Sequence, residues 1–246
     1  MKKTLWLVTL IFGLSLTQSF AKPLGGSSLA MITSVEGKAK VLPAHGIKKH
    51  QAKVGENLFA GDQLISYRNT KVLITFLDDS KIILNENASL LLESNTRLKH
   101  ERGEIYYRIV KRSKSRGLQV ETPFSIIGIK GTEFIIRFDK EGEISLNEGL
   151  IEVRSLGAQF ELHQKKSNNK FDTFQQKQDL EFSKYQEQQK QGFTTYVKKF
   201  DLHVHKVISF KSAQHCQQNC EKQVIEKSIT PDIMKQFKSY QFMMGR

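Results

Sequence analysis

Cysteine is scarce in this 246-residue chain, which contains only Cys216 and Cys220. In an oxidising compartment, an even pair of cysteines indicates one disulfide. A spacing of four residues, however, places both side chains on one helical face, where disulfide geometry is poor unless the helix ends or bends between them. A bridge within the pair, two free thiols and an intermolecular bond therefore all remain open.

Long apolar runs are also scarce. The first residues contain one, from Leu5 to about Leu16, which follows Lys2 and Lys3 and leads into a polar stretch ending at Ala21. About a dozen apolar residues fall short of the roughly 18 to 20 that a bilayer requires. The pattern predicts a signal peptide over residues 1–21, cleaved after Ala21.

Export has several consequences for the mature chain. We expect a periplasmic or secreted protein without a transmembrane anchor, because no later stretch has the length to span a membrane. No cysteine directly follows the cleavage site, which argues against a lipid anchor.

Acidic residues are outnumbered, with 25 against 38 lysines and arginines, so the net charge is +13. Removing the signal peptide lowers it to +11, because Lys2 and Lys3 are lost and no acid is. Such a charge favours acidic partners. Outside the cytoplasm these are anionic glycans, lipid headgroups or acidic protein surfaces rather than nucleic acid.

From Met31 to about Leu162, short β-branched and aliphatic runs alternate with turn residues, which predicts an all-β region. We expect strands over residues 71–77, 81–84 and 88–93, joined as hairpins because Asp and Asn tolerate turn backbone angles. Both faces of the 71–77 strand are apolar, so this strand should be central. Residues 143–155 instead alternate apolar and polar side chains, which predicts a half-exposed hairpin turning at residues 147–149.

The composition changes after about His163. Residues 175–191 are rich in glutamine and poor in apolar side chains, which is typical of a solvated helix or a partly ordered segment. Residues 200–210 alternate as one more strand would. Thr230 is a good N-cap and Pro231 suits the first helical position, so we expect an amphipathic terminal helix. Its apolar side chains repeat at helical spacing: Ile233, Phe237, Tyr240 and Met244.

The segment Thr122–Phe134, TPFSIIGIKGTEF, contains two glycines three residues apart. A phosphate-binding P-loop needs four residues between its glycines and a lysine after the second, whereas here Lys130 precedes Gly131. A nucleic-acid clamp of the KH type joins two helices, but both flanks here have strand character. The segment is therefore structural: Pro123 imposes extended geometry on Thr122, and the glycines allow strands to approach closely.

Taken in order, the motifs VGENLFAGDQL, VLITFLDDSKIILNENASLLLE, GEIYYRI, VETPFSIIGIKGTEFIIRF and EISLNEGLIEVR resemble the FecR domain. This domain is the extracytoplasmic module of bacterial iron-siderophore sensors and of many stand-alone envelope proteins. The resemblance spans about Met31 to Ser155. The residues that match the family signature are Gly61, Asp62, Gly103, Thr122, Pro123, Gly128, Gly131, Thr132, Glu133, Phe134, Glu148 and Gly149.

The sequence departs from the family pattern in three ways. Asp79 replaces the usual turn glycine, and Lys130 replaces the usual arginine; both changes are mild. Iron-sensing members also carry a cytoplasmic anti-sigma helix bundle and a membrane helix before this domain, where this chain has a cleavable signal. The resemblance thus implies fold and compartment, and sigma-factor control is not carried over.

The strongest interaction signal is the basic segment from Arg97 to Gly117. It is either a solvated hairpin loop or a docking surface for an acidic protein or an anionic envelope polymer, with salt-sensitive affinity. The candidate surface comprises Arg97, Lys99, Arg102, Tyr106, Tyr107, Arg108, Lys111, Arg112, Lys114 and Arg116.

Metal and catalytic motifs are weak. His203, His205, His215, Cys216 and Cys220 are ligand types for zinc or copper, but they lack a recognised spacing, so we expect no metal. No nucleophile elbow or zinc-protease helix is visible, and no cofactor is indicated. We expect a protein that is not an enzyme.

The sequence therefore predicts a signal peptide over residues 1–21, a mainly β FecR-type domain over residues 22–163 and a mostly helical, Gln- and Lys-rich extension over residues 164–246. The strands should form a sandwich or a solenoid-like stack. We expect the partner to be another envelope protein, within a signalling or assembly system, with an anionic glycan or lipopolysaccharide as the alternative.

Overall fold

The computed structural model describes residues 27–111, 117–138, 141–157, 159–164, 193–212 and 222–245. Several sequence predictions lie outside these residues: the signal peptide, the Gln-rich segment 175–191, His215, and the side chains of Arg112, Lys114, Arg116, Cys216 and Cys220. Among the described residues, no helix has the length and apolar character needed to cross a membrane.

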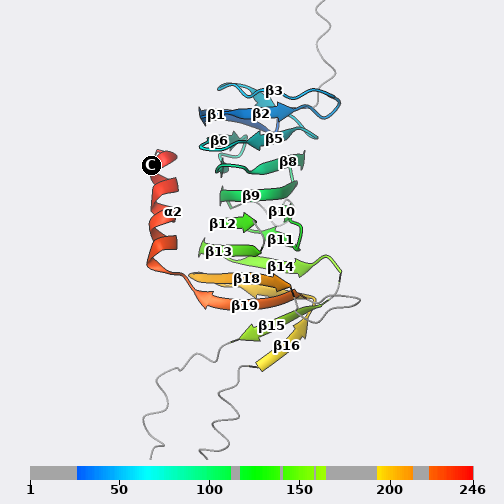
Figure 1. Ribbon diagram of the computed structural model, residues 1–246, viewed down its shortest axis with the longest axis vertical. Coiled ribbons are helices and arrows are strands. Elements are labelled where there is room, and N and C mark those ends of the chain that lie inside the picture. Colours follow the sequence, from blue (N-terminus) through cyan, green and yellow to red (C-terminus); the bar gives the residue numbers. More distant parts are fainter. Residues whose placement is uncertain are drawn as a thin grey trace, which may run out of the picture.

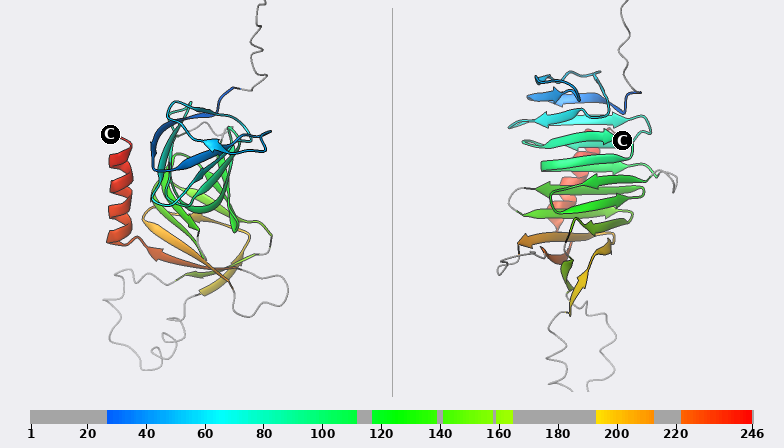
Figure 2. Two further views of the ribbon diagram at one scale, coloured as in Figure 1. Left: turned by 45° about the horizontal axis from the view of Figure 1, so that its top comes forward. Right: turned by 90° about the vertical axis from the view of Figure 1, so that its right-hand side faces the viewer.

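The 19 strands of the described residues stack along one axis in two facing sheets (Figures 1 and 2). In order, sheet A contains β4 (Asn57–Leu58), β1 (Ala30–Glu36), β6 (Lys71–Phe76), β7 (Lys81–Leu84), the second half of β9 (Arg97–Ile109), β12 (Thr132–Phe138), β13 (Gly142–Glu148), β18 (Lys206–Ser212), β19 (Lys222–Ser228), β15 (Phe160–Gln164) and β16 (Phe193–Val197).

Sheet B is built in the same way on the other side of the core. In order, it contains β3 (His50–Gln51), β2 (Ala39–Leu42), β5 (Gln63–Ser66), β8 (Ser89–Ser94), the first half of β9, β10 (Leu118–Glu121), β11 (Ser125–Ile129), β14 (Ile151–Ser155) and β17 (Lys199–Leu202). The predicted mainly β fold is confirmed, and it is both a sandwich and a stack.

Two layers of apolar side chains hold this body together. The main core lies between the sheets and is filled by inward-pointing residues of both, such as Ile74, Ile105, Phe134 and Val153. A second, smaller cluster lies on the outer face of sheet A, where α2 (Pro231–Met243) packs across the strands (Figure 1). The expected terminal helix is confirmed, with the Thr230 hydroxyl accepting from the backbone N–H of Ile233 at 3.5 Å.

Strand β9 belongs to both sheets. Residues up to Arg102 pair with β8 in sheet B, and residues from Gly103 onward pair with β12 in sheet A. Gly103 makes this passage at φ +82°, and a Cβ there would lie 2.5 Å from the Ala88 Cα. Only glycine fits a position that requires both a left-handed backbone and such a close approach.

Left-handed residues recur where the chain passes from one sheet to the other. Such residues occur at these corners as Gly37, Gly55, Gly61, Asn69, Asn87, Gly131, Gly149 and His205. The corners at Gly131 and Gly149 lie next to each other. A Cβ on Gly149 would lie 2.5 Å from the carbonyl oxygen of Gly131. Four of the signature glycines therefore turn the chain between sheets, whereas Gly128 has only ordinary contacts.

Not every predicted hairpin is one. Strands β6 and β7 do pair across the Asp79 turn, and β6 is central, between β1 and β7. The hairpin prediction for residues 143–155 is wrong, because β13 lies in sheet A and β14 in sheet B. The same holds for β7 and β8, since the polar turn at residues 85–87 is a corner between sheets.

The C-terminal extension also differs from the expectation. Its described residues form mainly strands, β16 to β19, and helix is confined to α2. Strand β17 pairs with β14, and β18 pairs with β13, so these strands continue both sheets. The single strand expected over residues 200–210 is two strands in different sheets, separated by His205 at φ 61°. Several apolar residues of the extension, such as Leu202, Ile208 and Phe210, are buried in the main core between the sheets.

Candidate functional site: the helix-covered face of sheet A

The outer face of sheet A carries an apolar stripe that crosses four neighbouring strands. Leu73, Ile83, Tyr106 and Ile135 contribute one side chain each from β6, β7, β9 and β12, and all four are buried. Outward positions of a sheet are usually polar when they face water. The stripe is buried because α2 covers it with Phe237, Tyr240 and Met244.

Aromatic contacts centre the helix on Tyr106. The ring of Phe237 meets it edge-on with centroids 6.1 Å apart, and the ring of Tyr240 lies 5.0 Å away. Such tilted and edge-on pairs add to the stability gained from burial alone. At the end of α2, the Lys81 ammonium donates to the carbonyl oxygen of Met244 at 3.1 Å.

Two buried carboxylates flank the stripe, one on each side of α2. Glu104 and Glu133 both point outward, on β9 and β12, and the pairing register places Tyr106 and Ile135 between them. Burying a carboxylate is costly unless it is paired and hydrogen-bonded. Each of these carboxylates has partners in the sheet and in the helix.

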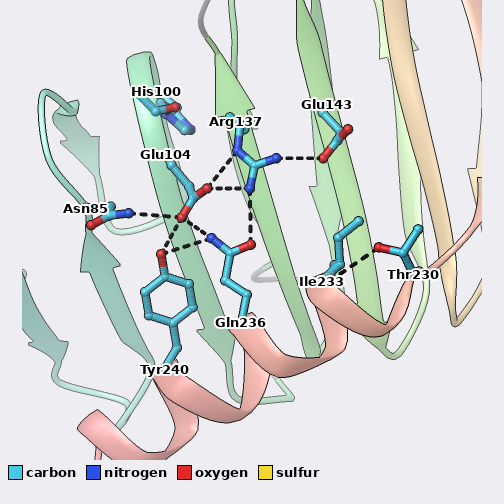
Figure 3. A network of polar contacts seen from close by, with 10 residues as sticks. Asn85, His100, Glu104, Arg137, Glu143, Thr230, Ile233, Gln236 and Tyr240 are labelled. Atoms are coloured by element: carbon cyan, nitrogen blue, oxygen red, sulfur yellow. Dashed lines mark hydrogen bonds and ion pairs between the residues drawn. The ribbon is translucent and has the colours of Figure 1, made fainter.

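Glu104 is the centre of the larger network (Figure 3). Within the sheet it is paired with Arg137 at 2.6 Å and accepts from the Asn85 amide at 3.1 Å. From α2 it accepts hydrogen bonds from the Gln236 amide at 2.6 Å and from the Tyr240 hydroxyl. Arg137 in turn donates to the Gln236 side-chain oxygen at 3.1 Å, which links helix and sheet twice.

Electrostatics keep this network charged. Burial alone would raise the pKa of the Glu104 carboxyl, but the hydrogen bond from Tyr240 and the charge of Arg137 outweigh it and hold the pKa below its ordinary value. Burial and the adjacent carboxylate raise the pKa of Tyr240, so its hydroxyl remains a donor. The helix is therefore held by donors that meet an ionised acceptor.

Glu133 organises the other flank. It accepts from the Tyr106 hydroxyl at 2.7 Å and from the Asn147 amide at 3.2 Å, both within the sheet. The Gln241 amide of α2 donates to the same carboxylate at 2.8 Å. A residue predicted only as part of the fold signature thus also anchors the helix.

The remaining signature residues have structural positions. Asp62 accepts from the backbone N–H groups of Ala44 and Phe59 at 3.0 and 2.8 Å, which fixes a turn. Thr122 shapes the tight turn into β11 by accepting from the backbone N–H of Ser125 at 2.9 Å, with Pro123 exposed. Phe134 stacks on Tyr107 in the core, 4.7 Å between centroids, and Glu148 is exposed at the end of β13.

The described residues of the predicted basic surface do not form a single surface. Tyr106 and Tyr107 were expected to be exposed but are fully buried, Tyr106 under α2 and Tyr107 between the sheets. Alternate residues of a strand point to opposite faces, and β9 also changes sheet at Gly103, so its side chains are dispersed. Arg97 and Lys99 lie on sheet B, where they pair with Glu93 and Glu121 at 3.7 and 3.6 Å.

The other described basic residues of this segment lie elsewhere. Arg102 is exposed at the bend of β9, Arg108 is exposed on sheet A, and Lys111 follows the end of the strand. Lys111, Leu77 and Val110 line a groove of about 440 Å³ at the edge of the sandwich. Among the described residues, no group of histidine, cysteine, aspartate and glutamate is arranged to hold a metal ion.

Residues 62–152 match the FecR protein family. This chain carries a FecR domain. The FecR domain includes β9 and β12, with the corner glycines Gly103, Gly131 and Gly149 and both flanking carboxylates, but α2 lies outside it. Sequence reasoning found the domain from its ordered turns and missed the role of Glu104, whose only signal was an acid at an outward position next to Tyr106.

Among solved structures, two crystal structures of a candidate anti-sigma factor from Parabacteroides distasonis ATCC 8503, at 1.65 and 2.50 Å resolution, are similar to this chain. Each alignment has 12% sequence identity and a TM-score of 0.44 and covers 70% of this chain. It covers 62% of the other protein, so this chain matches less than two thirds of that protein's length. A search of curated proteins gives no match.

Proposed function

We propose that this chain is an exported, non-enzymatic FecR-domain protein that binds another protein in the cell envelope, within a signalling or assembly system. The observation that carries the proposal is the FecR match over residues 62–152. The family's regulatory character supports a binding role, and the predicted signal peptide supports a periplasmic or secreted location. Because a fold alone does not define a function, a binding surface must carry the activity.

The placement of the basic residues favours a protein partner over an anionic polymer. Arg97 and Lys99 are already paired with acids, and the tyrosines that would have contacted a polymer are buried. In exposed ion pairs of this kind, the acids Glu93 and Glu121 offset the positive charge of Arg97 and Lys99. Binding to lipopolysaccharide or an anionic glycan is thus the weaker alternative.

The test is cross-linking of the full chain in the native envelope. A tagged chain is expressed in its host, cross-linked, and purified from the envelope fraction, with a Gly103→Val variant as a misfolded control. We expect one protein to be enriched with the wild type and lost with the variant. Recovery of the chain in the cytoplasm, or enrichment of no protein, would contradict the proposal.

The polymer alternative is separated by a second measurement. Purified lipopolysaccharide and envelope glycan are offered to the chain at low and at high salt. Binding that is strong at low salt and disappears at high salt, without any cross-linked protein, would favour the alternative. We expect no such binding.

A further inference from the structure

The association between α2 and sheet A has the features of a reversible contact. Helix α2 stands along the outside of the sheet and lies at the C-terminal end of the described chain (Figures 1 and 2). Only Ile229 and Thr230 separate its first residue from the end of β19. A rotation at these two residues would release the helix without breaking any pairing between strands.

Release of α2 would leave neither carboxylate unpaired. Glu104 would keep Arg137 and Asn85, and Glu133 would keep Tyr106 and Asn147, since these partners all belong to the sheet. Breaking a buried pair is strongly destabilising when a charge is left alone. Here the sheet supplies its own partners, so release uncovers mainly the apolar stripe.

The helix itself depends on this contact. It has 13 residues, including two phenylalanines, a tyrosine and a serine. Isolated helices shorter than about 12 to 15 residues are marginal in water even with favourable sequences. We therefore expect two states of this segment: it is helical when docked on sheet A and unfolded when released.

We propose that the stripe formed by Leu73, Ile83, Tyr106 and Ile135 is the docking surface for an amphipathic helix of the partner protein, and that α2 occupies it in cis until that helix takes its place. This inference rests on the proposed function, because it names the kind of protein that the chain binds. Helices laid into apolar grooves are a common mode of recognition, read through residues at i, i+3 or i+4, and i+7.

The contacts made by α2 define the chemistry of the partner helix. Phe237, Tyr240 and Met244 follow the i, i+3, i+7 pattern and fill the stripe, while Gln236 and Gln241 donate to a carboxylate on each side. Ionised carboxylates only accept hydrogen bonds. The partner helix should therefore carry donors at both flanks. Beside Glu104 an amide fits best, because Gln236 there also accepts from Arg137. Beside Glu133 an arginine would bind more tightly than glutamine because its donor is charged.

Hydrogen exchange on the wild-type full chain tests the release of α2. We expect backbone amides of α2 to exchange at least tenfold faster than those of β9 and β12, because the helix opens while the sheets stay paired. Exchange of α2 at the same rate as the two strands would show that the helix opens only with the whole body. That result would overturn the inference.

A labelled peptide of residues 229–245 tests the surface. It is titrated against the wild-type chain and against Phe237→Ala, in which the cis helix is weakened. We expect at least tenfold tighter binding to F237A, since the tethered helix competes less. Met244→Ala serves as a second, more conservative variant if F237A loses its β-sheet circular dichroism.

Variants of this peptide test whether the flanking carboxylates select hydrogen-bond donors on the bound helix. A Gln241→Glu peptide places a carboxylate against Glu133 and should bind at least tenfold more weakly, whereas a Gln241→Arg peptide should bind more tightly. Leu77→Glu, introduced with F237A at the sandwich-edge groove, should leave binding unchanged. Equal binding of the acidic and parent peptides, or loss of binding in the L77E protein, would overturn the inference. No envelope component is present, so failure here is distinct from failure of the cross-linking test.

Discussion

The outer faces of the two sheets have opposite character. Sheet A presents four buried apolar side chains beneath α2, flanked by Glu104 and Glu133. Sheet B presents exposed ion pairs such as Lys99 with Glu121 and Lys199 with Glu152. The comparison shows that an outward-pointing side chain of a strand becomes part of a core where another element, here α2, packs over it.

The largest effect should come from removing the central side chain of the covered face. Tyr106→Ala deletes a fully buried aromatic ring and takes a donor from Glu133. We expect it to lower the free energy of unfolding by about 3 to 5 kcal/mol. Lys99→Ala on sheet B should change it by no more than about 1 kcal/mol. Urea denaturation measures both, and equal losses would show that the two faces do not differ.

A smaller contrast is expected between acids on the two faces. Glu104→Gln weakens the pair between a buried carboxylate and the partly exposed Arg137, whereas Glu121→Gln weakens an exposed pair with Lys99. The expected losses are about 1 to 3 kcal/mol for the first and less than about 1 kcal/mol for the second. Thermal unfolding of the two variants provides the comparison, with double variants E104Q/R137A and E121Q/K99A as controls.

The Glu104 contrast should depend on pH. The folded pKa of Glu104 lies below its unfolded value of 4.5, so its contribution is present above pH 4.5 and is lost as the pH falls through the folded pKa. The stability gap between wild type and E104Q should therefore be full at pH 7 and shrink below pH 4.5. A gap that is constant down to pH 3 would contradict this assignment.

The titration of His100 also contributes to the pH dependence of stability, equally in wild type and E104Q. His100 lies in the core, where burial lowers its pKa to about 3 from an ordinary 6.5, despite hydrogen bonds to the carbonyls of Gly103 and Arg102. The unfolded chain therefore binds the proton first, and stability falls as the pH drops from 6.5 towards 3. The expected slope is about 1.4 kcal/mol per pH unit in both wild type and E104Q. His100→Gln should flatten it, which urea midpoints at pH 7, 5 and 4 would reveal.

The smallest effect is expected at a turn that touches neither outer face. Asp79 adopts φ 63° between β6 and β7, where the family usually has glycine. Asp79→Gly relieves the left-handed conformation but gives the unfolded chain more freedom, so we expect a change of less than about 1 kcal/mol in either direction. A larger loss, measured by urea denaturation, would indicate a contact of the Asp79 side chain that the fold requires.

Much of the fold could be predicted from local patterns. The apolar runs at residues 71–77 and 81–84 became β6 and β7, and the cap at Thr230 begins α2. Pairing was harder, because a polar turn such as residues 147–149 looks the same in a hairpin and at a corner between sheets. The Gly149 corner is fixed by its contact with Gly131, 18 positions earlier, which no local pattern contains.

The candidate site could be predicted only in part. Glu133 was identified, but as part of a signature, and its role as an anchor for Gln241 depends on where α2 docks. Tyr106 and Tyr107 were placed on a surface because basic residues surround them in sequence. Their burial follows from long-range packing, with Tyr106 under a helix more than 120 positions later.

By itself, the sequence determined the class of fold, the FecR signature and the terminal helix, since period, turn residues and caps act within a few positions. Only the tertiary structure decided which strands pair, where the chain changes sheet and which outward side chains are covered. These outcomes depend on contacts between residues far apart in the chain, whose side chains acquire a face and a neighbour only when the two sheets and α2 come together.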